Sequence, residues 1–382
     1  MAENVEDTFT LPDGQKIPVL AFGTWQVSGE KIKEVLPLAL DTGYRHIDTA
    51  YSYGNEEAIG DVLHDYFAQD KLKRADVFVA TKLWMTFLAK DDVRQGVEES
   101  LRRMRLDYLD LVMIHAPWGF KNRRDGTLFP LDDHGNFELE NYDLIDTWKA
   151  LEQLVTEGKV RSLGVSNFNS VQVDLVNFVA KVPPVVNQVE CHAYLPQKEL
   201  QEFCAKRGVR LSAFAPLGSP GRPEHLITDG EPVLLQESVL QTIGAKYGKT
   251  PAQVLLRSLT QRGIITISKS ITPSRIKENF EIFDFTLAAE DMVAIGKLRN
   301  NHRFFTFHKI TECSGIVPFD SMAKMAATHW IHARVCAIYQ IGIRQKGLLK
   351  DIGDTRFNLY CRFYQLYSIL AYMYSITFKN TV

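Results

Sequence analysis

The sequence is poor in cysteine: it has five in 382 residues, and no two of them form a Cys-x-x-Cys pair. An odd number of cysteines cannot all pair with one another, so neither a disulfide framework nor a zinc site is expected. Free thiols are typical of a reducing compartment. The acidic N-terminus, MAENVEDTFT, lacks the apolar stretch of a secretory signal. We therefore expect a cytosolic protein without a metal.

A large excess of charge of one sign is also absent. The formal net charge is -2, and 24% of the residues are charged, whereas a nucleic-acid-binding protein would carry a strong basic excess. We expect no nucleic-acid partner, and a small neutral or weakly charged molecule fits better. The chain is long enough to bury a substantial core. Single barrels can exceed about 250 residues, so one large domain is possible.

Short β-branched runs alternate with longer amphipathic segments along most of the chain. The short runs occupy residues 20–25, 46–50, 77–84, 109–115, 162–168, 186–192, 211–217 and 263–270. Segments between them, such as residues 93–104 and 146–160, place apolar residues at helical spacing. This alternation predicts a parallel sheet, and eight strand-helix units favour an α/β fold with a closed (β/α)8 barrel, the TIM barrel. Before the barrel, Pro12-Asp13-Gly14 predicts the turn of an N-terminal β-hairpin.

Two phosphate-binding motifs are missing. No Gly-x-Gly-x-x-Gly follows the first short run, which argues against the rival fold, a doubly wound dinucleotide-binding sheet. The stretch GAKYGKT at 244–250 resembles a phosphate loop, but the position that requires the first glycine holds Ile243. We expect Gly248 to end one helix and Thr250-Pro251 to begin the next.

Polar or aromatic residues stand at the end of every predicted barrel strand. In this fold the chemistry lies at the carboxyl ends of the strands. The residues are Trp25, Asp48 with Tyr53, Lys82, His115, Ser166 with Asn167, Gln188, Phe214, and Lys269 with Ser270. Any one of them alone would more often be structural, but eight in register indicate a site.

Four of these residues form a chemical set. The Tyr53 phenol, with an ordinary pKa of about 10, is a poor proton donor at neutral pH, and a cation at Lys82 would lower that pKa. Asp48 would keep Lys82 charged and fixed, while His115 could donate a hydrogen bond to a substrate carbonyl. The set lacks a nucleophile with a paired base and lacks metal ligands. It therefore favours carbonyl reduction with a borrowed hydride over hydrolysis.

Six stretches resemble the aldo-keto reductases, particularly the aldose and aldehyde reductase branch, over about residues 9–319. They are GYRHIDTAYSYGNE, TKLW, LDLVMIHAP, GVSNF, NQVECHAYLPQ and SKSITPSRIKENF. The resemblance implies a (β/α)8 barrel that binds NADPH across its C-terminal face and reduces aldehydes and some ketones. It places Asp48, Tyr53, Lys82 and His115 on the family's catalytic tetrad.

The resemblance also implies a set of cofactor-binding residues. Ser166, Asn167 and Gln188 match positions that hold the nicotinamide carboxamide, and Phe214 matches an aromatic residue that stacks on the ring. Further matches to the cofactor site are Leu217 and Ser219 in the loop after Phe214, Lys269, Ser270, Thr272 and Arg275 around the adenosine 2′-phosphate, and Glu278 and Asn279 near the adenine. Two cations beside the 2′-phosphate favour NADPH over NADH.

The substrate pocket implied by the resemblance is aromatic, and the substrate is a small carbonyl compound. Its residues are Trp25, Trp84, His115, Phe120, Phe304 and Phe305. Apolar walls around one polar anchor select by shape, so we expect broad aldehyde specificity. Related enzymes are commonly monomeric, and we expect a monomer.

The sequence departs from the family pattern at several positions. Ala116 stands where a tryptophan usually follows the catalytic histidine, which predicts a wider pocket there, and Trp118 lies two residues later. The stacking residue is Phe214 instead of the common tyrosine. Many relatives close a loop over the cofactor pyrophosphate with a lysine-aspartate pair, but here these positions hold Gln26 and Gly221. Because loop opening often limits turnover, we expect faster release of the cofactor.

The last 62 residues, 321–382, differ in composition from the expected barrel domain of residues 1–320. They contain eight Lys and Arg against two Asp and Glu, no proline, and an uncharged run at 363–378. That run is shorter than the roughly 20 apolar residues of a membrane span, so membrane contact is not expected. The extension fits an alternative terminal exon that packs weakly, or translated non-coding sequence. It also supports an alternative function, a catalytically silent NADPH-binding protein that acts through the barrel or the extension.

Overall fold

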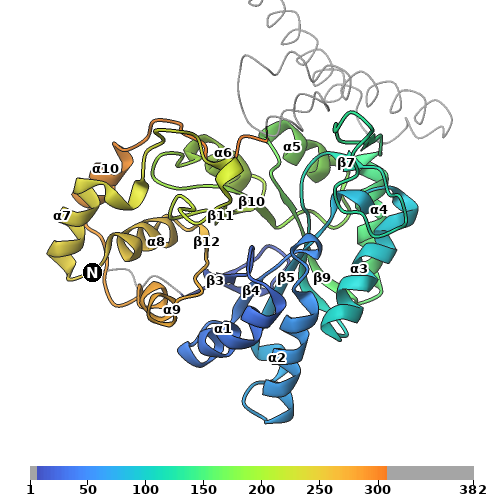
Figure 1. Cartoon of the computed structure of the whole chain (residues 1–382), viewed down its shortest axis with the longest axis horizontal. Helices are drawn as coiled ribbons and strands as arrows, with labels where there is room; N and C mark the ends of the chain where they lie inside the picture. Colours follow the sequence, from blue (N-terminus) through green and yellow to red (C-terminus); the bar gives the residue numbers. More distant parts are fainter. Residues whose placement is uncertain (1–6, 308–382) are drawn as a thin grey trace, which may run out of the picture. The chain divides into compact units, whose positions relative to one another are not determined.

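A computed structural model describes residues 7–307, and the expected extension at 321–382 lies outside these described residues. Eight parallel strands form a closed barrel in the order β10-β11-β12-β3-β4-β5-β6-β9, and β9 pairs with β10 to close it (Figure 1). The strands are β3 (Leu20–Gly23), β4 (His46–Asp48), β5 (Phe78–Leu83), β6 (Leu109–Ile114), β9 (Val160–Ser166), β10 (Val186–Glu190), β11 (Arg210–Phe214) and β12 (Ile265–Ser268). Each lies within or overlaps one of the eight short runs, so the predicted barrel is confirmed.

Helices surround the strands in Figure 1. The α-helices are α1 (Gly29–Thr42), α2 (Glu56–Ala68), α3 (Lys90–Met104), α4 (Leu144–Thr156), α5 (Ser170–Val179), α6 (Lys198–Ala205), α7 (Ser238–Tyr247), α8 (Pro251–Gln261), α9 (Pro273–Phe280) and α10 (Ala289–Gly296). The short 3-10 helices within residues 7–307 are η1 (Tyr51–Tyr53), η2 (Arg74–Asp76), η3 (Met85–Phe87), η4 (Glu224–Leu226) and η5 (Leu234–Gln236). In α3, Val93, Val97, Leu101 and Met104 are buried, as their helical spacing predicts.

The stretch that resembles a phosphate loop is a helix-helix junction. Gly248 ends α7 in the left-handed region, with a φ of 64°. The Thr250 side chain then caps α8, which has Pro251 in its first turn, and the Gln253 side chain accepts a reciprocal hydrogen bond from the Thr250 backbone N–H. The predicted helix boundary is confirmed.

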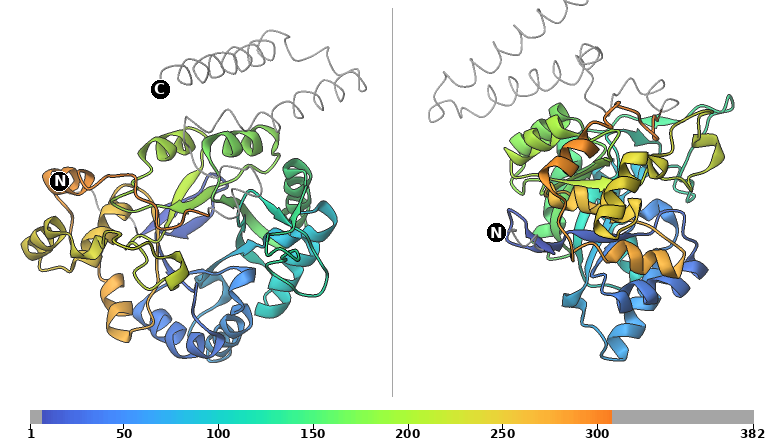
Figure 2. Two further views of the ribbon diagram at one scale, coloured as in Figure 1. Left: turned by 45° about the horizontal axis from the view of Figure 1, so that its top comes forward. Right: turned by 90° about the vertical axis from the view of Figure 1, so that its left-hand side faces the viewer.

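The N-terminal hairpin closes one end of the barrel. Strands β1 (Thr8–Thr10) and β2 (Lys16–Pro18) are antiparallel, and Gly14 turns between them with a φ of 87°. Leu11 and Ile17 belong to a buried cluster with Phe78, which begins β5, and with Val185 next to β10. Figure 2 (right) shows the dark blue hairpin at one end of the barrel, with the teal and yellow connections extending from the other.

The longest connection follows β6. It contains a two-stranded antiparallel pair, β7 (Gly119–Phe120) and β8 (Leu139–Glu140), which brackets residues 121–138. Across residues 7–307, no helix is long and apolar enough to span a membrane, and no group of three or more His, Cys, Asp or Glu side chains could hold a metal ion. Cys191 and Cys204 are both buried.

Candidate active site

Three predicted catalytic residues lie on neighbouring strands. Asp48 ends β4, Lys82 lies near the end of β5, and His115 directly follows β6. These strands pair in that order, so their carboxyl ends meet at the same end of the barrel. The 3-10 helix η1 comes two residues after β4 and ends with Tyr53. The local sequence therefore delivers all four side chains to one place.

Asp48 and Lys82 form a buried ion pair. The Lys82 Nζ atom donates to Asp48 Oδ1 at 2.7 Å and to the Thr49 carbonyl at 2.8 Å. The second Asp48 oxygen, Oδ2, accepts from Gln188 Nε2 at 2.8 Å. A buried pair is stable only when further hydrogen bonds satisfy its remaining polar atoms, and both partners have them here. Burial lowers the pKa of Lys82, and the Asp48 carboxylate opposes that shift.

Tyr53 lies beside both His115 and Lys82. The Tyr53 and His115 rings meet edge to face with centroids 5.8 Å apart, and Lys82 Nζ lies 5.3 Å from the Tyr53 ring centroid. The sequence argument expected Lys82 to lower the pKa of Tyr53. In the structure the direction is opposite: burial first, and then the Asp48 carboxylate, raise the pKa of Tyr53 well above 10.0. The main reason is burial, which disfavours the charged phenolate, and the Asp48 carboxylate adds to the effect.

His115 is a neutral imidazole near neutral pH. Burial, followed by the nearby Lys82 cation, lowers the pKa of His115 well below 6.5. Its ring meets Trp84 edge to face at 5.1 Å. The Nδ1 atom is buried and has no hydrogen-bond partner among residues 7–307. A neutral imidazole keeps one N–H group that can donate to a ligand.

The residues expected to hold the nicotinamide carboxamide form one hydrogen-bonded unit. Asn167, with a φ of 61°, donates from Nδ2 to the His115 carbonyl at 2.9 Å, and Ser166 Oγ donates to the Gln188 carbonyl at 3.0 Å. Asn167 Oδ1 is buried without a partner within the described range. An unpaired buried acceptor is costly, so this oxygen suits an incoming amide donor. The unit therefore fits a carboxamide.

The expected ring-stacking residue ends β11. Phe214 is half-buried, and the following loop holds Leu217 and Ser219, also half-buried. Two positive φ angles, 51° at Ala215 and 48° at Ser219, turn the chain sharply after the strand. The turn leaves the Phe214 ring at the same end of the barrel as the tetrad.

The residues expected around the 2′-phosphate lie between β12 and the first turn of α9. Lys269 and Ser270 follow the strand, Thr272 is the N-cap residue of α9, and Arg275 lies in its first turn. Lys269 is half-buried, and burial alone lowers its pKa. Neither Lys269 nor Arg275 has an ion-pair partner in the described part of the chain, which leaves two cations available for a phosphate group.

The two residues expected near the adenine lie on α9. Glu278 Oε1 accepts a hydrogen bond from Thr250 Oγ1 at 2.7 Å, which links α9 to the start of α8. Asn279 is buried. Both lie one turn further along the helix that begins beside the two cations, so the cofactor positions implied by the resemblance form a continuous strip.

The expected substrate residues divide into two aromatic groups and one outlier. Trp84 contacts His115 and Phe120, with Trp84–Phe120 ring centroids 6.1 Å apart. Phe305 meets Trp25 at 5.6 Å and Phe214 at 5.5 Å, each edge to face. Phe304 instead packs against His192 at 4.9 Å and Tyr194 at 6.3 Å. The structure therefore brings the Phe305 ring to Trp25 and Phe214, whereas the Phe304 ring lies against Gly218, between Leu217 and Ser219.

Two residues that the sequence argument did not single out contribute to the site. Phe129 is half exposed and meets Trp84 edge to face at 5.1 Å, and the Trp84 Nε1 atom donates to the Leu128 carbonyl at 2.7 Å. Glu190 contacts the backbone of Phe304 and Phe305. Phe129 lies in the connection after β6, far from any strand end, so no strand-end pattern points to it.

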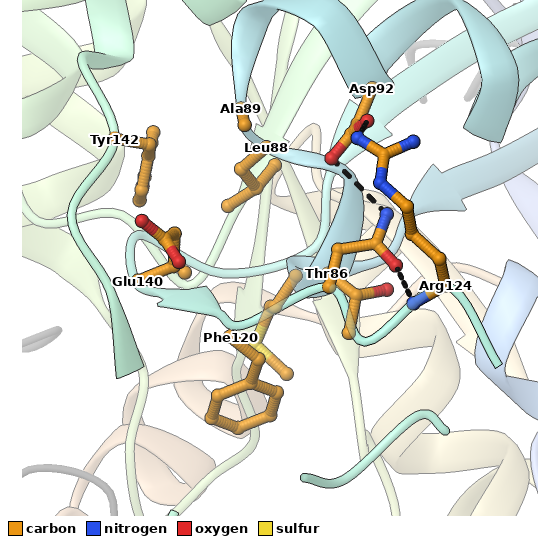
Figure 3. Close-up of a pocket in the computed structure, with 11 residues that line it drawn as sticks. Thr86, Leu88, Ala89, Asp92, Phe120, Arg124, Glu140 and Tyr142 are labelled. Carbon is orange, nitrogen blue, oxygen red and sulfur yellow. Dashed lines mark hydrogen bonds and ion pairs between the residues drawn. The ribbon is translucent and has the colours of Figure 1, made fainter. Parts of the chain in front are cut away.

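A cavity of about 180 Å³ lies between the connection that follows β6 and the start of α3 (Figure 3). It is lined by Met85, Thr86, Leu88, Ala89, Asp92, Gly119, Phe120, Asn122, Arg124, Glu140 and Tyr142. Buried Asp92 accepts from Arg124 at 2.7 Å and from Asn122 at 3.1 Å. The predicted substrate residue Phe120 lines the cavity, but no member of the tetrad does, and we regard Asp92 as an anchor of the connection.

The comparison with known families identifies the fold's relatives. The sequence model of the aldo/keto reductase family matches residues 19–300. The chain belongs to this family. The resemblance drawn from the six motifs is confirmed. The four residues of the predicted tetrad all lie within the matched residues.

Individual aldo/keto reductases support the same assignment. The chain is 45% identical to aldo-keto reductase family 1 member A1 of Gallus gallus over 300 residues, which cover 78% of this chain and 90% of that protein. It is 44% identical to family 1 member C15 of Rattus norvegicus over 299 residues, covering 77% and 91% of the two chains. The solved aldose reductase from Schistosoma japonicum matches with a TM-score of 0.75 and 39% identity, covering 80% and 97%. This protein is thus homologous to aldehyde and aldose reductases.

Proposed function

We propose that this protein reduces aldehydes, and some ketones, to alcohols with NADPH. The observation that carries the proposal is the linked group in which Gln188 and Lys82 hold Asp48 while Tyr53 and His115 meet edge to face. This arrangement supplies a proton donor and a carbonyl-orienting group, with neither a nucleophile-base pair nor a metal-ligand set beside them in the described residues. Family membership supports the same reaction class.

The tetrad divides the work of reduction among its side chains. When bound, the cofactor supplies a hydride to the carbonyl carbon. The neutral His115 ring donates an N–H to the carbonyl oxygen and so orients the substrate. Tyr53 gives its phenolic proton to the same oxygen, which completes the alcohol and leaves a phenolate. The adjacent Lys82 cation, fixed by Asp48, stabilises that phenolate.

The chain's own residues also support NADPH as the cofactor. The unpaired Asn167 Oδ1 atom would accept the carboxamide N–H, and Phe214 would offer its face to the nicotinamide ring. Lys269 and Arg275 would pair with the 2′-phosphate, which NADH lacks. Trp25, Trp84 and Phe305 would form apolar walls that select by shape. The scarcity of cysteine agrees with a cytosolic setting.

The decisive experiment compares Tyr53→Phe with wild type in NADPH oxidation by an unhindered aromatic aldehyde. Loss of the phenolic proton should lower kcat by about 10³-fold or more while the Kd for NADPH changes little. Tyr51→Phe is the matched control, because it removes the same atom from the same 3-10 helix but from a ring that packs on Arg103 and Phe87. If wild type binds NADPH but reduces no aldehyde, the chain is a silent cofactor-binding protein instead.

A further inference from the structure

Glu190 is a buried carboxylate at the end of β10, two residues after Gln188. Alternate residues of a strand face the same side, and Gln188 reaches Asp48 from that side. Glu190 is 1% exposed, and its Oε1 atom accepts from the Phe304 backbone N–H at 2.7 Å. Its Oε2 atom accepts from the Phe305 N–H at 3.3 Å, and Arg303 Nη1 lies 3.9 Å from that oxygen. One strand therefore carries both an Asp48 contact and an anchor for the segment after α10.

His192 completes the surroundings of this carboxylate. The His192 Nδ1 atom accepts from the Leu195 N–H at 3.3 Å, which assigns the ring proton to Nε2. The Nε2 atom then donates to Glu190 Oε1 at 2.9 Å. The carboxylate thus receives three N–H donors inside the protein, which is what a buried charge requires. This donor set holds both consecutive backbone N–H groups in fixed places.

The rings of the two anchored residues have different neighbours. The Phe304 ring lies against His192 and under the Arg222 guanidinium, 4.8 Å from its centroid. The Phe305 ring lies against Trp25 and Phe214. The Glu190 carboxylate accepts from both backbone N–H groups at once and so holds the backbone that carries the two rings.

We propose that Glu190 is a positioning residue for the substrate site: it holds Phe305 as a fixed aromatic wall between Trp25 and the ring-stacking Phe214. This inference rests on the proposed reductase function. It adds to that function the residue that positions one aromatic wall of the substrate pocket. An aromatic aldehyde would contact the Phe305 wall. A short aliphatic aldehyde would reach Tyr53 and His115 with little contact to that wall.

Glu190→Gln tests the anchor with almost no change of shape. The amide has only one oxygen, so its NH2 group must face one of the two backbone N–H donors. The segment should then loosen without opening a cavity. We expect the ratio of kcat/KM for benzaldehyde to kcat/KM for propanal to fall about tenfold, mainly through a higher KM for benzaldehyde.

Glu152 offers a matched control. It is also a buried carboxylate that accepts two consecutive backbone N–H groups, those of Lys181 at 2.6 Å and Val182 at 2.9 Å, but it accepts both through Oε1, lies on α4 and contacts the chain after α5. Glu152→Gln removes a buried carboxylate but keeps one oxygen for both N–H groups, so it should leave the aldehyde ratio unchanged. A merely structural role of Glu190 would make the two variants kinetically alike.

Amide hydrogen exchange of the two full-length variants gives a readout that does not depend on turnover. Exchange at Phe304 and Phe305 should accelerate in Glu190→Gln and not in Glu152→Gln. An aldehyde ratio within twofold of wild type, or a ratio that rises, would overturn the proposal, as would unchanged exchange at those amides. If wild type itself reduces neither aldehyde, the proposed function fails, and the exchange data alone then show whether Glu190 holds the segment.

Discussion

The Tyr53 phenol and the Asp48 carboxylate lie in one buried group, and their proximity sets the pH behaviour of the site. Burial and Asp48 raise the pKa of Tyr53 above 10.0, so the phenol keeps its proton until alkaline pH. The lowered pKa of His115 keeps the imidazole neutral down to acidic pH. Between these limits both residues hold the protonation state that carbonyl reduction needs.

We therefore expect kcat/KM for aldehyde reduction to stay constant from about pH 7 to about pH 9 and to fall only above that range, as Tyr53 loses its proton. A pH profile in a constant-ionic-strength buffer measures this. A tenfold fall between those two pH values would instead support a phenol whose pKa is lowered by Lys82, which is what the sequence argument expected.

Lys269 carries the second prediction at this scale. Its pKa is lowered by burial, and no described carboxylate compensates it, so a phosphate should pair with it strongly. Lys269→Met should raise the Kd for NADPH about ten- to hundredfold and leave that for NADH nearly unchanged. Fluorescence titration measures both. Lys277→Met removes an exposed cation from α9, the helix that follows Lys269, and should alter neither constant.

At the scale of elements, Gln26 in the loop after β3 and Gly221 in the loop after β11 cannot form an ion pair with each other over the expected cofactor site. Gln26 and Gly221 are both exposed, and a Cβ at Gly221 would meet no atom within 4 Å. The Gln26→Lys, Gly221→Asp double variant should therefore fold and add an exposed ion pair. We expect it to slow release of NADP+ about two- to fivefold, because such pairs are weak.

Stopped-flow measurement of NADP+ release tests the loop prediction, with each single variant as its control. Only the double variant should be slower than wild type. Release rates that are equal in all four proteins would mean that loop opening does not control the departure of the cofactor.

At the scale of the whole barrel, the buried cluster under the N-terminal hairpin and the tetrad lie at opposite ends. Ile17 is fully buried in the hairpin that closes the N-terminal end, where it packs with Leu11 and Phe78. Ile17→Ala should lower the free energy of unfolding by about 3 kcal/mol through the cavity it leaves. Because the tetrad stands at the other end, kcat should remain within about twofold of wild type.

Urea denaturation and steady-state kinetics on the same preparation measure these two effects. A large loss of kcat in Ile17→Ala under conditions where the protein stays folded would contradict the separation of the two ends.

The sequence was sufficient for the barrel, and it also predicts the four residues of the tetrad. Short β-branched runs alternate with helical segments, and the rule that barrel chemistry lies at strand ends then points to Asp48, Lys82 and His115. These inferences depend on local spacing and on strand order, both of which are written along the chain. The family motifs extend over the same residues, which is why the fold could be predicted in detail.

Only the tertiary structure decided how residues from distant segments meet. Phe304 and Phe305 are adjacent and identical in sequence, yet the Phe305 ring meets Trp25 and the Phe304 ring meets His192, while Glu190, 114 residues before Phe304, accepts from the Phe304 backbone N–H. The pKa of Tyr53 likewise rises instead of falling, because burial and the Asp48 charge act on it together. The burial of a side chain, the orientation of its ring and the electrostatic field around it all depend on neighbours in space. A pattern along the sequence does not show which residues those neighbours are.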